Sequence, residues 1–197
     1  VQGGVSIDYT TVDNSAIDIS DYTSQSGTLN FTGTTPESFT ITVPTVEDII
    51  AESTEAYYLN FSSITNALVT YDVQAIGTIT DDDIFTISIA DNSIAETESA
   101  QILNFAVTMT GEAQEDVVLS FSTTQVTATA AIDYITESAV VVIIPAGSTS
   151  VNIPVNILGD LILEPTETFT GTITLSNANG QTISIADGTA IGTITDN

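Results

Sequence analysis

The sequence predicts an all-β protein built from two tandem antiparallel β-sandwich domains of immunoglobulin-like type. Three observations support this expectation. Short stretches alternate apolar and polar residues, as half-buried strands do, and they are rich in Thr, Val and Ile, which favour strands. No stretch has a convincing helical period. Most of the first half of the chain recurs in the second half, which indicates a duplication.

The first block contains a regular series of expected strands with turn signals between them. In the strand expected at 38–43, Phe39, Ile41 and Val43 share one face, and further along Tyr57, Leu59 and Phe61 share another. The strands expected in this block are 5–9, 27–31, 38–43, 57–61 and 75–80.

The second block repeats this order at an offset of 112 residues, so that Asp133-Tyr134 corresponds to Asp21-Tyr22. It also has an additional beginning, 84–110, with strand-like alternation that the first block does not match. We therefore expect a sandwich at 1–82 that lacks its first strand and a complete sandwich at 83–197. The linker between them is Asp81 to Asp83 and little else.

Charge is the unusual feature of the composition. The 197 residues contain 26 Asp and Glu and no Lys, Arg or His, so the formal charge is −26 and no salt bridge between side chains can form. A basic patch for nucleic acid or anionic membrane is excluded. The hydrophobic fraction of 42% still allows a core, and no apolar run is long enough to insert into a membrane. With no Cys, stability depends on the core and on any bound metal.

These features resemble tandem Calx-beta domains, which are known from the regulatory region of the sodium–calcium exchanger and from large bacterial surface proteins. Four sequence words carry the resemblance, in the same order in both blocks. They are Asp21-Tyr22, the acids Asp48/Glu52/Glu55, Asn66-Ala67 and Gly77 to Asp83, and then Asp133-Tyr134, the acids Asp160/Glu164/Glu167, Asn177-Ala178 and Gly192 to Asp196.

The resemblance implies a Ca²⁺ site at one end of each sandwich, where the acids converge. Carried over residue by residue, the first site would use Asp21, Glu47, Asp48, Glu52, Asp81, Asp82 and Asp83, and the second would use Asp133, Asp160, Glu164 and Asp196. A further acid near the first strand of the second block would be Asp91 or Glu96. Gly159 and Asn197 stand where the pattern has acids, so we expect the second site to be poorer in carboxylates. Without bound cations, the same acids would be solvated loop residues.

A structural role is favoured over catalysis. The chain has no His, Cys or Lys to act as a base or nucleophile, and no Trp to support a sugar in a two-carboxylate glycosidase, so we expect no enzyme. The resemblance implies a calcium-stabilised module of an extracellular fibre or surface adhesin, located outside the cell or on its surface. The alternative is a domain of a surface protein that binds a specific glycan, ice or receptor ligand.

The strand missing from the first block leaves two explanations. Either the parent protein has residues before Val1 that supply it, or a neighbouring molecule donates it. In the second case, head-to-tail contacts with other copies or adjacent repeats would generate a filament.

Overall fold

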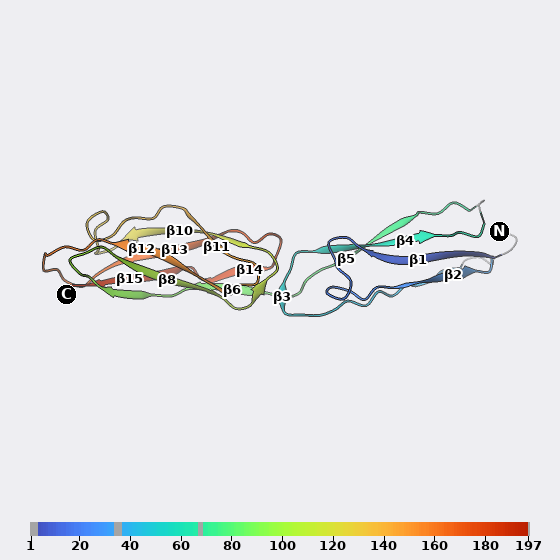
Figure 1. Cartoon of the computed structure of the whole chain (residues 1–197), viewed down its shortest axis with the longest axis horizontal. Coiled ribbons are helices and arrows are strands. Elements are labelled where there is room, and N and C mark those ends of the chain that lie inside the picture. The colour runs from blue at the N-terminus through green and yellow to red at the C-terminus, as the bar shows by residue number, and fades with distance from the viewer. Residues whose placement is uncertain (1–3, 34–36, 67–68, 197) are drawn as a thin grey trace. The chain divides into compact units, whose positions relative to one another are not determined.

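The structure is a computed structural model that describes residues 4–33, 37–66 and 69–196. Within these ranges the chain forms strands, turns and loops and contains no helix, which confirms the all-β expectation. Accordingly, none of the described residues belongs to a helix that could cross a membrane. The chain divides into two compact units, one from 1–48 with 54–80 and one from 49–53 with 81–197 (Figure 1).

The described residues of the first unit form an antiparallel sheet of four strands, in the order β2-β1-β4-β5. The strands expected at 5–9, 27–31, 57–61 and 75–80 are confirmed. Val5 and Ile7 of the central strand are buried, since they are no more than 9% exposed. The bounds are β1 Val5–Asp13, β2 Ser26–Phe31, β4 Glu55–Ser62 and β5 Gln74–Ile79.

The prediction of a strand at 38–43 is wrong. This segment has extended alternation but forms no ladder, and its neighbourhood holds only an isolated bridge between Tyr22 and Thr45. The physical reason is the lack of a hydrogen-bonding neighbour, because a strand exists only as part of a pair. The turn expected at Asn66-Ala67 lies partly outside the described residues.

The second unit has two facing sheets and a short parallel pair. The five-stranded sheet has the order β11-β10-β13-β15-β7, the four-stranded sheet has the order β12-β8-β6-β14, and β3 pairs with β9. Pairing is antiparallel except for β14–β6, β15–β7 and β3–β9. The bounds are β3 Ile50–Ala51, β6 Phe85–Ile89, β7 Asn92–Ala95, β8 Gln101–Met109, β9 Glu112–Ala113, β10 Val117–Gln125, β11 Val140–Ile144, β12 Ser150–Ile157, β13 Glu167–Asn177, β14 Ile183–Asp187 and β15 Thr189–Thr195.

Strand β8 shows how the sequence pattern builds the core of this unit. Its alternate residues Leu103, Phe105, Val107 and Met109 are all buried, with at most 5% of each exposed. The ring of Phe105 lies 5.9 Å from that of Phe121 and 5.8 Å from that of Phe169. Burial of such side chains contributes roughly 1.5–3 kcal/mol each.

A buried tyrosine occurs at the same place in both units. Tyr22 stacks on Tyr57 with ring centroids 4.8 Å apart, and Tyr134 stacks on Phe169 at 4.3 Å. Both tyrosines are almost completely buried. Since an aspartate directly precedes each tyrosine, packing of the ring also fixes the position of the carboxylate.

The turns that lead into the two Asp-Tyr pairs have the same backbone strain. Ile19 has φ of 78° and its counterpart Ala131 has φ of 64°, in the left-handed region that L-residues rarely occupy. Each turn is closed by its aspartate, because the Ile17 amide donates to Asp21 at 2.5 Å and the Thr129 amide donates to Asp133 at 2.5 Å. Because the same strain occurs in both turns, we infer that the surrounding structure imposes it in order to position the aspartate.

Replacement of Ile19 by glycine should stabilise the first unit. A β-branched residue at positive φ is strained, whereas glycine adopts this conformation freely, and the side chain of Ile19 is 81% exposed and contributes little to packing. We expect the free energy of unfolding to rise by about 1 kcal/mol, measured by chemical denaturation. The matched control is Ile17→Gly, two residues earlier without positive φ, which should lower stability.

Candidate metal centres

Three carboxylates converge at one end of the second unit. Asp133 lies in the turn before the buried Tyr134, Glu164 lies in the loop before β13, and Glu167 is the first residue of β13. Each offers one oxygen, and these oxygens lie within 4.8 Å of one another. Asp133 is only 5% exposed. The chain therefore holds three acids close together although no cationic side chain exists to balance them.

Three further acids surround this cluster. The Asp160 amide donates to a carboxylate oxygen of Glu96 at 3.1 Å, and the Glu164 amide donates to Asp196 at 3.1 Å. Glu96 is buried, and both Asp160 and Asp196 act electrostatically on Glu164. The structure thus brings together all four acids that the sequence predicted for this site, and it favours Glu96 over Asp91 as the additional one. Asp91 instead accepts a hydrogen bond from the Ile191 amide at 2.6 Å.

Burial and neighbouring negative charges raise the pKa of two glutamates in this cluster. Burial, followed by the hydrogen bond and charge of Asp133 and the charge of Glu164, raises the pKa of Glu167 from 4.5 to about 7. Burial and the charges of Asp133, Asp160 and Glu96 also raise the pKa of Glu164. A bound cation would reverse this repulsion, because an opposite charge favours the ionised form.

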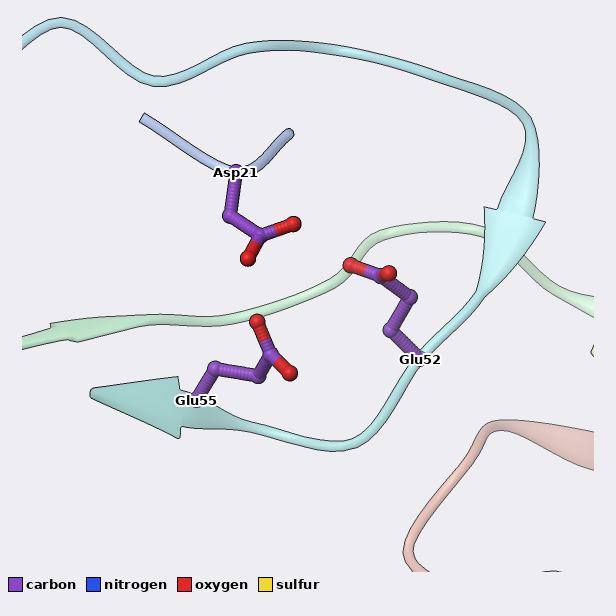
Figure 2. Close-up of side chains that lie close together, drawn as sticks. All are labelled: Asp21, Glu52 and Glu55. Carbon is purple, nitrogen blue, oxygen red and sulfur yellow. The ribbon is translucent and has the colours of Figure 1, made fainter. Parts of the chain in front are cut away.

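The corresponding acids of the first block form a second cluster. Asp21, Glu52 and Glu55 each place an oxygen within 4.8 Å of the other two, and Figure 2 shows the three carboxylates turned toward one another. Asp21 and Glu55 are buried, at 6% and 7% exposed. The Glu52 amide donates to Asp81 at 3.0 Å, as the Glu164 amide donates to Asp196.

Other acids expected at the first site lie outside this cluster of three. Glu47, Asp48 and Asp82 are exposed. Asp83 is half-buried, and its amide donates to Asp81 at 3.3 Å. A ligand role for these four acids stays a prediction. The inner carboxylates of this site are those of Asp21, Glu52 and Glu55.

Glu55 and Glu167 were not among the ligands carried over from the resemblance, yet each belongs to a cluster. Their position in the sequence could have indicated this. Each follows a predicted ligand by three residues, and each begins the strand that carries the aromatic partner of the buried tyrosine. Gly159, which replaces an acid, also has a structural explanation. A Cβ at this position would collide with the Thr97 carbonyl and with Ser99, on the loop that follows Glu96.

Comparison with known proteins identifies the class. The family model of the Calx-beta domain matches residues 1–83 and again residues 80–197. The chain therefore belongs to the Calx-beta family and consists of two such domains in tandem, as the resemblance implied. No curated protein sequence matches it.

One solved structure supports the fold, and two others are similar at lower TM-scores. The crystal structure of the apo-form Calx CBD1 domain is similar with a TM-score of 0.50 and 14% identity, over 58% of this chain and 99% of that one. The tandem CBD12 of CALX1.2 matches over 98% of this chain and 88% of its own, with 18% identity and a TM-score of 0.43. The structure described as calcium binding domain CBD12 of CALX1.1 matches at 19% identity, over 97% and 87%, with a TM-score of 0.43.

The raised pKa of Glu167 predicts how stability depends on pH without metal. The folded-state pKa of about 7 exceeds the ordinary value of 4.5, so the native state binds the proton more tightly than the unfolded chain. The contribution of Glu167 to stability is complete below about pH 4.5 and is lost as pH rises through 7. In EDTA, Glu167→Gln should flatten the fall in free energy of unfolding between pH 5 and pH 8. An unchanged pH profile would contradict the assignment.

Proposed function

We propose that the chain is a calcium-stabilised structural module of an extracellular fibre or large surface adhesin. The observation that carries the proposal is the pair of acid clusters, Asp21/Glu52/Glu55 and Asp133/Glu164/Glu167, built from equivalent loops in a chain without a single cationic side chain. In such a chain, charge balance at a buried acid cluster has to come from solution.

Calcium fits the chemistry of these donors. It takes six to eight oxygens, from carboxylates, backbone carbonyls and water, at roughly 2.3–2.6 Å. In the second unit, Asp133, Glu164 and Glu167 would be the inner ligands, and Glu96, Asp160 and Asp196 would orient them or add oxygens. In the first sequence block, Asp21, Glu52 and Glu55 would take the inner role, with Asp81 held against the Glu52 amide.

The proposed extracellular location goes with weak calcium binding. Extracellular calcium modules work at dissociation constants of roughly 10⁻⁴–10⁻³ M, which suits calcium outside cells. At a hundred times the dissociation constant, one site would add about 2.7 kcal/mol to stability, a large part of that of an ordinary domain. Loss of calcium would then lower the stability of the module by the same amount.

The proposed mode of action is mechanical rather than catalytic. Two tandem sandwiches, at about 1–82 and 83–197, would provide length and stiffness on the cell surface. Their partners would be other copies or adjacent repeats in head-to-tail order, with no part for nucleic acid or membrane insertion. The acidic surface supports this proposal, because a net charge of −26 keeps extended chains soluble and repels anionic surfaces.

Calcium should raise the melting temperature of both units, and EDTA should remove the effect. Glu167→Gln is the most informative variant, since it removes repulsion when calcium is absent and removes a ligand when calcium is present. We expect it to stabilise the second unit in EDTA but to lower calcium affinity by at least about tenfold. Differential scanning calorimetry with and without calcium measures both effects.

The control is Asp187→Asn, at an exposed acid that ends β14 and belongs to neither cluster. It removes the same charge and should leave the calcium response unchanged. Equal melting curves for the unmodified chain in calcium and in EDTA would rule out the proposed stabilisation.

A further inference from the structure

We propose that two copies of this chain pair through strand β11, antiparallel and about a two-fold axis at Val142. Strand β11 lies at the edge of the five-stranded sheet, and in the described part of the chain its ladder partner is β10 alone. The contact is lateral, between the sides of two second units, so it goes beyond the head-to-tail order of the proposed function. It depends on neither calcium nor the acid clusters.

Strand β11 is unusually apolar for the edge of a sheet. Its five residues, Val140–Ile144, are all β-branched and include none of the 26 acids of the chain. Val141 is 67% exposed and Ile143 is 43% exposed on one face, whereas Val142 on the other face is 8% exposed. An edge with apolar side chains on both faces and no charge is a template for pairing with a further strand.

The other three edges of the two facing sheets carry features that oppose such pairing. Strand β12 contains Pro154, which has no amide hydrogen to donate to an added strand. Strand β14 ends at the exposed Asp187. Strand β7 lies between Asp91 and Glu96, so antiparallel pairing of two β7 strands about their centres would place Asp91 of one copy opposite Glu96 of the other. With no Lys, Arg or His in the chain, no side chain could relieve that repulsion.

The ends of β11 fix the register of the pair. The preceding Ala139 has φ of 51°, in the left-handed region, and Pro145 follows the strand directly. The extended backbone is therefore limited to 140–144. Two such strands pair along their full length only when Val142 of one copy faces Val142 of the other, which places the two-fold axis there.

This register joins apolar residues without placing one acid opposite another. Val141 faces Ile143 of the second copy, and by symmetry the same pair forms twice. Cross-strand pairs of this kind stabilise a sheet. Glu137, the acid that precedes the strand, falls level with Gly147 of the second copy. In a chain of charge −26, a self-contact that avoids opposed acids is a specific property of this strand.

A groove beside β11 provides space for the added strand. It has a volume of about 360 Å³ and is lined by residues of both β11 and β12, including Val142 and Ile153, and by Phe121 of the core. A strand paired with β11 lies about 4.7–4.9 Å from it. Because opposite residues of an antiparallel pair point to the same face, Val142 of the second copy points toward the groove. The pairing therefore covers core residues at the open side of each sandwich.

Sedimentation of the whole 197-residue chain in EDTA tests the proposal. We expect a dimer whose fraction rises with chain concentration up to about 1 mM, where even a millimolar dissociation constant gives a detectable dimer. The fraction should also rise with salt, up to about 1 M, because salt screens the repulsion between two strongly acidic molecules. A monomer under all these conditions would overturn the proposal, as would a dimer that forms only in calcium. Filaments would overturn it too, since a two-fold contact closes on itself.

A matched pair of variants locates the contact. Val141→Asp places a charge beside the two-fold axis, on a side chain exposed enough to leave the far-UV circular dichroism unchanged, and should weaken the dimer at least tenfold. Ile191→Asp adds the same charge on the same face of the same sheet, on β15, where Ile191 is 49% exposed. It should leave the dissociation constant unchanged. Equal weakening by both variants, or by neither, would show that β11 is not the contact.

Mixing charged variants tests the register. Val141→Asp mixed with Ile143→Lys brings the two substituted side chains opposite each other, so the mixture should form a heterodimer more tightly than either variant pairs with itself. Val141→Asp mixed with Val141→Lys leaves them as diagonal neighbours, about 7–8 Å apart, and should restore pairing less. Stronger restoration by the second mixture would indicate a parallel pair and would overturn the two-fold arrangement.

Discussion

Repulsion between carboxylates is the constraint on which the rest of the structure depends. The chain has 26 acids and no cationic side chain, so no internal ion pair can offset the burial of Asp133 beside Glu164 and Glu167. The cost is visible in the pKa of Glu167, which is raised to about 7. Other acids avoid this cost by exposure to solvent or by accepting backbone hydrogen bonds. Among the described residues, groups of three acids are held together at the two clusters, and the turn before each Asp-Tyr pair contains a residue with positive φ.

The core and the clusters are coupled through the Asp-Tyr pairs. Stacking of Tyr22 on Tyr57 and of Tyr134 on Phe169 fixes the turn from the apolar side, while the aspartate accepts amides from the polar side. Since Glu55 and Glu167 begin the strands that carry Tyr57 and Phe169, the same stacking also sets the positions of the glutamates. A cation bound at these acids would therefore stabilise the core packing directly.

The sequence was sufficient for the fold class and for most of the strands, because alternation and duplication are local signals. Four of the ligands that it predicted, Asp21, Glu52, Asp133 and Glu164, lie in the two acid clusters of the structure. The sequence did not distinguish the inner carboxylates from the exposed Glu47, Asp48 and Asp82. The burial of each acid depends on the conformation of its loop, which is not a local property of the sequence. Glu55 and Glu167 belong to the acidic stretches that carry the resemblance but were left out of the ligand list, since an acid at the start of a strand is buried only through tertiary packing.

The failure at 38–43 has a different origin. Its alternation is as clear as that of β12, its counterpart, and its end is held by the same hydrogen bonds, yet it is not a strand. The local sequence favours an extended strand, but a strand forms only when a neighbouring strand is present to pair with it. An alternating segment that is correctly placed but unpaired therefore carries information about what it pairs with. Here Phe39, Ile41 and Val43 correspond to Val151, Ile153 and Val155 of β12, and the difference between the two segments is the pairing of β12 with β8.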